Sequence, residues 1–426
     1  MTDEQFDGKI DFVILAAGQG KRLAPITTGY PKAMVRILGK PLLEWIVEGA
    51  LASFAGRVGK IVVVVGFEGE RIRQNFASKP YSGKIEFVEQ AQQKGTAHAL
   101  AAASRAVTSE SFFVLNGDAF FDPSVFDYLR EQSGRGHFII AKREHDTSSY
   151  GVIEKDEGDC LSGLVEKPRG SSDALVSTGT FFLPRSFFGL LEVPLSKRGE
   201  HELTDAVLSY AKGNKLRVAE FPGFWTDVGY FWNYLHACEY ALERLMPESR
   251  QGTIEDFAVV KGKLHLGAGS VIKSGSYIEG NAYIGENCVI GPNAYLRKGV
   301  VVEDNCHIGN STEIKASVIM RNSNAAHLSY IGDSIVCESV NFGAGTKIAN
   351  LKFDHSSIAI DVAGKRVDSR RNKLGAVVGK GTKTGVNVSI NCGIFIGENC
   401  RIFPSSYVYN NLPDNSVFRG NDSEKQ

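Results

Sequence analysis

Two glycines and two cations near the start of the chain have the types and spacing that phosphoryl transfer requires. Gly18 and Gly20 follow an apolar run at residues 12–15. Because glycine has no Cβ, a triphosphate can lie against the backbone amides of this loop. Arg22 and Lys32 add positive charge that could stabilise a departing pyrophosphate. The pattern is neither the Gly-x-Gly-x-x-Gly of a dinucleotide fold nor the Gly-Lys-Ser/Thr of a P-loop.

Two aspartates are candidates for a metal site. Asp118 ends the run Phe-Phe-Val-Leu-Asn-Gly-Asp, and a carboxylate at the end of such a strand, beside a phosphate loop, could hold Mg²⁺. Asp227, in Trp-Thr-Asp-Val-Gly, offers a second carboxylate far downstream. Together with phosphate oxygens the two would complete an octahedral site. The alternative for Asp118 is an ordinary turn, since Asn-Gly-Asp is common turn chemistry.

Gln90 is the candidate for recognition of a base. Its amide can donate and accept together, which matches the edge of a uracil or thymine ring. Gly95 and Thr96 follow it, and Gly95 would let the ring approach the chain closely. The alternative is a surface loop in which Thr96 caps the next helix.

A third polar group follows at Glu166 and Lys167. The carboxylate could accept hydrogen bonds from sugar hydroxyls, and the ammonium could pair with a sugar phosphate. Gly151 and Gly179, which flank the pair in the sequence, would leave room for a pyranose ring. An isolated Glu-Lys-Pro is usually a solvated loop, which is the competing interpretation.

Alternating apolar runs and helical patterns must position these groups. Strands are expected at 12–15, 60–66, 85–88, 111–115 and 137–141, and helices at 41–54, 70–77, 96–107 and 123–131. Such alternation predicts an α/β, Rossmann-like fold with a mixed, mainly parallel sheet covered by helices on both faces. Ligands of these sheets bind at the carboxyl ends of the strands, where the polar motifs fall. Apolar and aromatic residues at helical spacing over 230–246 predict a connecting helix that closes this first domain.

The second half of the chain has a six-residue period. Aliphatic residues recur at Leu266, Ile272, Ile278, Ile284, Ile290, Leu296, Val302, Ile308 and Ile314. This period is the mark of a left-handed parallel β-helix of hexapeptide repeats, a triangular prism in which the aliphatic residues stack. The phase slips after Ile314, and a second excursion at 350–376 is rich in Lys and Arg. Since breaks in a repeat mark loops, and loops carry function, both breaks are candidates for a site.

Composition limits the remaining choices. At 426 residues two domains are expected, and 48 basic against 48 acidic residues disfavour a nucleic-acid or membrane-surface partner. The seven cysteines include no Cys-x-x-Cys pair, which favours free thiols in a reducing cytoplasm. We expect no signal peptide and no membrane-spanning segment.

The first half resembles the sugar-1-phosphate nucleotidylyltransferases. The match consists of Gly18, Gly20, Arg22, Pro25, Thr27, Pro31, Lys32 and Gly39-Lys40-Pro41. The resemblance implies Mg²⁺-dependent transfer from UTP or dTTP to a sugar-1-phosphate, with Arg22 and Lys32 as catalytic cations. It implies nucleotide contacts by Ala17, Gly18, Gly20, Gln90, Gly95 and Thr96, sugar-phosphate contacts by Gly151, Glu166, Lys167 and Thr178, and metal ligation by Asp118 and Asp227.

The second half resembles the acetyltransferase part of the bifunctional enzymes, of archaeal type, that make UDP-N-acetylglucosamine. A His-Leu-Ser-Tyr-x-Gly-Asp run begins at His327, and Asn341-Phe-Gly-Ala-Gly-Thr follows. The resemblance implies acetyl-CoA as co-substrate, glucosamine-1-phosphate or galactosamine-1-phosphate as acceptor, His327 as the base, and a homotrimer. It implies that Arg297 and Lys315 hold the sugar phosphate and that Tyr330, Asn341 and Asn350 lie around the amine and phosphate, with Ala344 in the same site. The chain departs from the pattern at Ser356, where bacterial members carry lysine.

These expectations divide the chain into a nucleotidyltransferase domain at 1–229, a connecting helix and linker at 230–260, a β-helix acetyltransferase domain at 261–418 and a tail at 419–426. Two alternatives remain open. One is a glucose-1-phosphate thymidylyltransferase or mannose-1-phosphate guanylyltransferase whose prism only assembles subunits. The other is a non-catalytic regulatory subunit, although the retained Arg22, Lys32, Asp118 and Asp227 speak against it.

Overall fold

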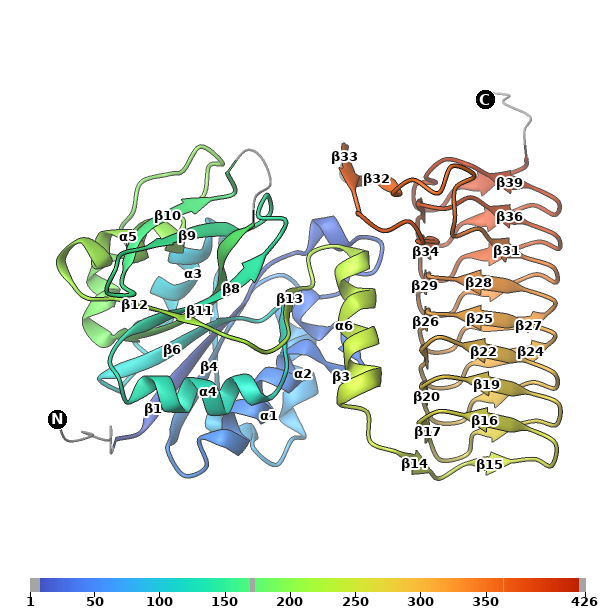
Figure 1. Cartoon of the computed structure of the whole chain (residues 1–426), viewed down its shortest axis with the longest axis horizontal. Coiled ribbons are helices and arrows are strands. Elements are labelled where there is room, and N and C mark those ends of the chain that lie inside the picture. The colour runs from blue at the N-terminus through green and yellow to red at the C-terminus, as the bar shows by residue number, and fades with distance from the viewer. Residues whose placement is uncertain (1–7, 169–172, 363, 421–426) are drawn as a thin grey trace. The chain divides into compact units, whose positions relative to one another are not determined.

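The computed structural model describes residues 8–168, 173–362 and 364–420, so most of the predicted tail at 419–426 lies outside the described residues. The chain forms two compact units (Figure 1). Unit 1 comprises Met1–Gly20, Gly29–Val35 and Pro41–Asp227, and unit 2 comprises Lys21–Thr28, Arg36–Lys40 and Val228–Gln426. Within the described residues, no helix is long and apolar enough to cross a membrane.

Unit 1 is built on a mixed sheet, as predicted. Its parallel part has the order β5-β4-β1-β6 and consists of β1 (Ile10–Ala16), β4 (Val58–Val65), β5 (Ile85–Glu89) and β6 (Ser111–Asn116). Antiparallel pairing begins beyond β6 and involves β8 (Phe138–Glu144), β9 (Gly151–Lys155), β10 (Leu161–Glu166) and β11 (Ala174–Pro184), while β12 (Arg217–Glu220) runs parallel to β8. A separate antiparallel pair joins β7 (Ala119–Phe121) to β13 (Trp225–Asp227).

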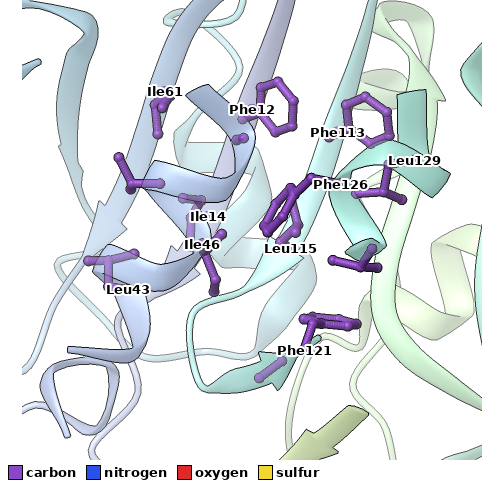
Figure 2. Close-up of a cluster of buried hydrophobic side chains, with 14 of the residues drawn as sticks. Phe12, Ile14, Leu43, Ile46, Ile61, Phe113, Leu115, Phe121, Phe126 and Leu129 are labelled. Atoms are coloured by element: carbon purple, nitrogen blue, oxygen red, sulfur yellow. The ribbon is translucent and has the colours of Figure 1, made fainter. Parts of the chain in front are cut away.

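Helices cover both faces of this sheet. They are α1 (Leu42–Ser53), α2 (Gly69–Ala77), α3 (Thr96–Ala102), α4 (Ser124–Ser133) and α5 (Leu203–Gly213). Strand β1 is buried on both sides, because Phe12 packs in one core cluster and Val13 in the other. Figure 2 shows the first cluster, in which Phe12 stacks on Phe113 with ring centroids 4.9 Å apart. Helix α3 is shorter than the predicted 96–107, because successive i→i+3 turns replace the helix after residue 102.

Shorter elements connect these layers. They are the 3₁₀ turns η1 (Lys21–Leu23), η2 (Lys32–Met34), η3 (Ser82–Lys84) and η4 (Arg185–Leu190), and the strands β2 (Arg36–Ile37) and β3 (Lys40–Pro41).

Unit 2 contains the predicted left-handed parallel β-helix, whose three sheets form a prism (Figure 1). The first prism sheet contains β14 (Ser249–Arg250), β17 (Leu264–Leu266), β20 (Ala282–Ile284), β23 (Val300–Val302), β26 (Val318–Ile319), β29 (Ile335–Val336), β34 (Ala376–Val378) and β37 (Ile394–Ile396). The second contains β15 (Thr253–Ile254), β18 (Val271–Ile272), β21 (Val289–Ile290), β24 (His307–Asn310), β27 (Asn324–His327), β30 (Asn341–Phe342), β35 (Lys383–Thr384), β38 (Arg401–Ile402) and β40 (Val417–Phe418). The third contains β16 (Val259–Lys261), β19 (Tyr277–Glu279), β22 (Tyr295–Arg297), β25 (Glu313–Lys315), β28 (Tyr330–Gly332), β31 (Lys347–Ile348), β36 (Ser389–Ile390) and β39 (Tyr407–Val408).

The predicted break after Ile314 is not a loop, so this part of the sequence interpretation was wrong. The buried positions continue through Ile319, Ala325, Ile331 and Val336 without leaving the prism. Two of these steps span five residues instead of six, and alanine replaces one aliphatic side chain. The periodicity therefore fades although the strands β25 to β29 continue the stack.

The second predicted break is a true excursion, which we call the arm (residues 350–375). It carries an antiparallel pair, β32 (Ala359–Val362) and β33 (Lys365–Asp368). The prism continues past it, because β29 pairs with β34 and β31 pairs with β36. The arm is therefore an insertion into an unbroken prism.

Helix α6 (Phe231–Arg244), predicted to close the first domain, falls in unit 2. The Tyr234 hydroxyl donates to the Arg36 carbonyl at 2.6 Å. Glu239 pairs with Arg371, which follows the arm's strand pair, at 2.6 Å. Together with the buried aromatic face of α6, these contacts group the helix with the prism.

Candidate active sites

The glycine loop follows β1 and is tied down by a residue that sequence reasoning missed. The Gln93 side chain donates to the Ala17 carbonyl at 2.6 Å. A Cβ at Gly18 would meet no atom within 4 Å, so the surface there is open. Gly20 has a φ of 68°, a conformation that favours glycine. The loop is thus held at its base and offers bare backbone beyond it, as a phosphate cradle requires.

Three predicted site residues of unit 1 meet in one cluster. Lys32 Nζ lies 2.5 Å from Asp118 Oδ2 and 3.0 Å from Asp227 Oδ1. Asp227 reaches this position because β13 pairs with β7, which places it opposite Ala119. Lys32 is only 6% exposed, so its ammonium is held away from bulk water between the two carboxylates.

The donor set of this cluster fits a magnesium ion. Residues that the structure describes form no group of three or more His, Cys, Asp or Glu side chains around a common point. Two carboxylates alone leave coordination positions for water and phosphate oxygens, which is how Mg²⁺ is usually held beside a nucleotide. Lys32 then acts on the carboxylates themselves and neutralises part of their charge.

Arg22 belongs to the contact group of unit 2. Its guanidinium carbon lies 5.1 Å from the centroid of the Tyr230 ring, within the range of a cation–π contact.

Gln90 makes contacts that differ from the predicted double readout of a base. The residue is 5% exposed, and its Nε2 lies 3.1 Å from the Gly95 carbonyl and 3.0 Å from His98 Nδ1. Its amide nitrogen is therefore engaged within the chain. Gly95 has a φ of 113°, and a Cβ there would lie 2.4 Å from the His201 carbonyl oxygen, so only glycine fits.

Thr96 neither caps its own helix nor lies in an open loop. Its hydroxyl accepts a hydrogen bond from the Leu203 amide at 2.9 Å, at the start of α5. It thereby ties α3 to α5.

The sugar-side residues gather around Glu166. Lys167 Nζ lies 3.3 Å from Glu166 Oε1, and a Cβ at Gly151 would come within 3.1 Å of Glu166 Oε2. Arg198, which sequence reasoning missed, places Nη1 3.6 Å from Glu166 Oε1 and pairs with buried Glu202 at 2.7 Å. No local pattern links Arg198 to the sugar-side residues, because it lies 32 positions from Glu166 and meets that residue only through folding.

Thr178 is not brought into this group. Its side chain is 2% exposed, and its hydroxyl donates to the Ile140 carbonyl at 3.2 Å. The next residue, Gly179, has a φ of 74°, and a Cβ there would clash with Asn116 at 2.1 Å. This stretch therefore serves close packing of β11 against the end of β6.

In unit 2, the cations predicted to hold a phosphate are already matched by carboxylates. Arg297 Nε donates to Glu313 Oε1 at 2.6 Å. Lys315, 4% exposed, forms an ion pair with buried Asp333, and the Asn350 amide donates to the same carboxylate. Most of the positive charge of Arg297 and Lys315 is therefore neutralised by the chain itself.

His327 lies apart from these cations within one chain. It ends β27 in the second prism sheet, is exposed, and precedes Leu328, which is 60% exposed. Asn341 pairs in register with Asn324 in the same sheet, and Ala344 follows shortly after β30. Tyr330 opens β28 beyond the corner, and burial raises the pKa of its hydroxyl. Strand β28 separates His327 on one side from Asp333 on the other.

Comparison with known proteins agrees with both halves of this arrangement. The family model "Nucleotidyl transferase" matches residues 12–244, and the model "GMPPB C-terminal domain" matches residues 272–374. A bifunctional protein GlmU of Methanococcus maripaludis (strain C7) is 42% identical over 96% of each chain. A bifunctional sugar-1-phosphate nucleotidylyltransferase/acetyltransferase of Sulfurisphaera tokodaii is 38% identical over 95% of this chain and 99% of its own. The chain belongs to this bifunctional family.

A solved structure of apo UDP-glucose pyrophosphorylase is similar to the first half of this family member. It is 25% identical, with a TM-score of 0.50, and the match covers 56% of this chain and 100% of that chain.

This nucleotidylyltransferase/acetyltransferase has a cavity of about 680 Å³ between the arm and the third prism sheet. Tyr330 and Lys347 line it from the sheet, and Lys352 and Arg366 line it from the arm. Lys352 Nζ lies 3.3 Å from the Ser356 hydroxyl, the position at which the chain departs from the bacterial pattern, and 2.5 Å from the Ser357 carbonyl. An ammonium group is therefore present beside position 356, although a different residue carries it.

Proposed function

We propose that the chain acetylates an amino-sugar-1-phosphate from acetyl-CoA and transfers a nucleotidyl group from a triphosphate to the acetylated sugar-1-phosphate. The acceptor would be glucosamine-1-phosphate or galactosamine-1-phosphate, and the triphosphate UTP or dTTP. UDP-N-acetylglucosamine would be the product with UTP. The observation that carries the first half is the Lys32–Asp118–Asp227 cluster. The full-length similarity to bifunctional relatives supports the pairing of the two activities.

In the nucleotidyl site, the glycine loop would hold the triphosphate against backbone amides, with Gly18 and Gly20 admitting close approach. Gln90 and Gly95 would lie along the base. Asp118 and Asp227 would hold Mg²⁺, which when bound supplies charge neutralisation for the pyrophosphate. Lys32 positions the two carboxylates and limits their mutual repulsion.

The sugar end would be held by Glu166 and Lys167, with Arg198 fixing the carboxylate. A phosphate oxygen of the sugar-1-phosphate attacks the α-phosphorus, and pyrophosphate leaves in line. That oxygen is already an anion at neutral pH, so no general base is required. The residues of the site act by alignment and by balancing negative charge.

In the acetyl site, the sugar amine attacks the thioester carbon of acetyl-CoA, and the C–S bond breaks to release the CoA thiol. His327 takes the amine proton as the new bond forms. Its exposed position at the end of β27 supports this role, because the imidazole can reach a bound amine. Arg297 and Lys315 would hold the sugar phosphate so that the 2-amino group faces His327, and their ion pairs with Glu313 and Asp333 fix the positions of the two cations.

We further propose a homotrimer in which His327 of one subunit faces the third prism sheet of the next. The separation of His327 from Asp333 by β28 supports this arrangement. Exposed apolar side chains on the prism, including Leu328, Val386 and Phe403, would be covered by the contact. The free cysteines support a reducing, cytoplasmic location. Residues 1–229 would carry nucleotidyl transfer and residues 261–418 acetyl transfer, although β14, β15 and β16 already pair in the prism sheets ahead of residue 261.

The direct test is a matrix of four nucleoside triphosphates against glucosamine-, galactosamine-, N-acetylglucosamine- and glucose-1-phosphate, each with and without acetyl-CoA. Pyrophosphate and free CoA thiol are measured in every well. The proposal expects thiol release only with amino-sugar phosphates, and pyrophosphate release with UTP or dTTP. Pyrophosphate release without thiol release from any amino sugar would leave only the nucleotidyl activity.

A further inference from the structure

The cavity between the arm and the third prism sheet has an unbalanced charge. Arg366, on its wall, is paired with Asp361 at 3.0 Å. Lys347 and Lys352 also line the cavity, and neither ammonium forms an ion pair with a carboxylate among residues 8–168, 173–362 and 364–420. Two cations without counter-ions on the wall of one cavity favour an anionic ligand.

The two ammonium groups are fixed by the backbone. Lys352 Nζ donates to the Ser357 carbonyl at 2.5 Å, and Lys347 Nζ donates to the Gly345 carbonyl at 3.0 Å. Each ammonium has three donors, so these bonds leave capacity for an anion. Both groups are therefore positioned in advance, which lowers the entropic cost of holding a ligand.

The other walls suit a polar organic ligand. Tyr330 and Tyr407 present phenol rings, Asn391 presents an amide, and the cavity volume of about 680 Å³ is ample for a sugar phosphate or part of a nucleotide. Cys392 also lines the cavity and is one of only two half-buried cysteines among the described residues, the other being Cys160 in unit 1.

We propose that this cavity binds a phosphate monoester, held by the ammonium groups of Lys347 and Lys352. The choice of ligand rests on the proposed acetyl transfer, because both of its substrates carry such a group. The amino sugar carries it at C1, and coenzyme A carries it at the ribose 3′ position. Arg297 and Lys315 of the third prism sheet are already paired with Glu313 and Asp333, so Lys347 and Lys352 add positive charge that no carboxylate of the cavity balances.

Protection of Cys392 from alkylation tests the proposal without relying on turnover. The full-length protein is alkylated at a pH of about 9, because burial raises the pKa of the Cys392 thiol. The ratio of Cys392 to Cys160 modification is followed by peptide mass spectrometry. Four ligands are tested separately, as two matched pairs. Glucosamine-1-phosphate is compared with glucosamine, and acetyl-CoA is compared with 3′-dephospho-acetyl-CoA. At ten times its Kd, a ligand in the cavity should slow Cys392 modification roughly tenfold.

We expect one phosphorylated ligand to protect and its dephosphorylated counterpart not to protect, and the protecting member identifies the source of the phosphate. Lys347→Gln and Lys352→Gln should each weaken protection by at least about tenfold in ligand concentration. Lys365→Gln, which removes the same charge from the arm but not from the cavity wall, should leave it unchanged.

The proposal is overturned if neither phosphorylated ligand protects Cys392, or if protection survives in both lysine variants. Thiol release from acetyl-CoA is measured on the same wild-type sample. Acetyl transfer without protection would remove the cavity proposal and leave the proposed function. Lysine-dependent protection without acetyl transfer would leave a phosphate site and remove that function.

Discussion

At the residue scale, both reaction centres depend on charges that the chain partly neutralises itself. Lys32 bridges Asp118 and Asp227, and Lys315 is paired with Asp333. Two carboxylates held this close would repel each other without the shared ammonium. The Lys32 ammonium thus holds the oxygens of Asp118 and Asp227 close together, as preorganisation for a metal cation would require.

Lys32→Met should abolish most nucleotidyl transfer, because it leaves Asp118 and Asp227 unbalanced and misplaced. We expect kcat for pyrophosphate release to fall by about a hundredfold to a thousandfold. Acetyl transfer, measured as thiol release, should stay within about twofold, since a single substitution in unit 1 leaves the prism intact.

Lys60→Met is the matched control, because Lys60 on β4 forms an exposed ion pair with Glu86 on β5. Its pyrophosphate release should match the wild type. A Lys32 variant that folds by circular dichroism and keeps the wild-type rate would remove Lys32 from the account.

Residue roles were predictable from the sequence only where a local pattern carried them. Asp118 and Lys32 stand in recognisable motifs, but the bond between them joins positions 86 residues apart. Arg198 and Gln93 have no such motif and were missed. The neutralisation of Lys315 by Asp333 follows from stacking of successive coils, which brings residues 18 positions apart into contact.

At the element scale, the six-residue period of the sequence specifies the prism, and the interruption of that period specifies the position of the arm. Buried aliphatic side chains at every sixth position identified the strands in advance, because this spacing puts one inward-facing side chain on each successive face of the prism. The slip after Ile314 misled the interpretation, since a five-residue step and Ala325 keep the geometry but weaken the pattern. The spacing of residues in the sequence does not show in advance that the prism accepts a step of five residues in place of six.

The packing of α6 on the prism buries a carboxylate and should make stability depend on pH. Glu303 is 5% exposed, and burial raises its pKa above the ordinary 4.5 despite Arg36 and Arg321. The folded chain therefore binds this proton more tightly than the unfolded chain does. The free energy of unfolding should fall as the pH rises from 4.5 through the folded-state pKa, and stay lowered above it.

Glu303→Gln should remove this loss while keeping the bond from the Arg321 amide, which the wild-type carboxylate accepts at 3.2 Å. Urea midpoints are compared for wild type and variant from pH 4.5 to 8. We expect the urea midpoint of the variant to increase relative to that of the wild type as the pH rises. At pH 8 the variant should have the higher midpoint. A constant difference across the series would contradict the account.

Excision of the arm's strand pair should separate folding of the prism from acetyl transfer. Replacing residues 359–368 by Asn-Gly joins Ile358 to Ser369, whose amide already donates to the Ile358 carbonyl at 3.1 Å. The prism ladder continues from β31 to β36, so we expect circular dichroism to keep its strand signal. Thiol release should fall by at least about a hundredfold, while pyrophosphate release persists. Retained thiol release would show that the arm is dispensable.

At the scale of the whole molecule, two compact units carry two different chemistries on one chain. Full-length similarity to bifunctional relatives places both units in one family, and the proposed trimer would complete the acetyl site. The fold of each unit was predictable, because periodicity and strand–helix alternation are local properties. The assembly of subunits could not be predicted in this way, because an exposed apolar side chain such as Leu328 does not indicate which surface of another subunit would cover it.

Native mass spectrometry should find three chains per particle. Leu328→Arg places a charge in the proposed contact and should shift the particles to one chain, with loss of thiol release but not of pyrophosphate release. A wild-type particle of one chain that still releases CoA thiol would contradict the trimeric site.

The most direct test of two separate centres is a crossed assay of Asp118→Asn and His327→Asn, with both products measured for each variant. His265→Asn, in β17 of the first prism sheet, where the ring stacks on Tyr283 away from His327, is the matched control. The account predicts that Asp118→Asn loses pyrophosphate release and keeps thiol release. For His327→Asn it predicts that thiol release falls by about a hundredfold or more while pyrophosphate release is kept. The control variant should keep both rates. Loss of both products in either folded variant, or undiminished thiol release from His327→Asn, would contradict it.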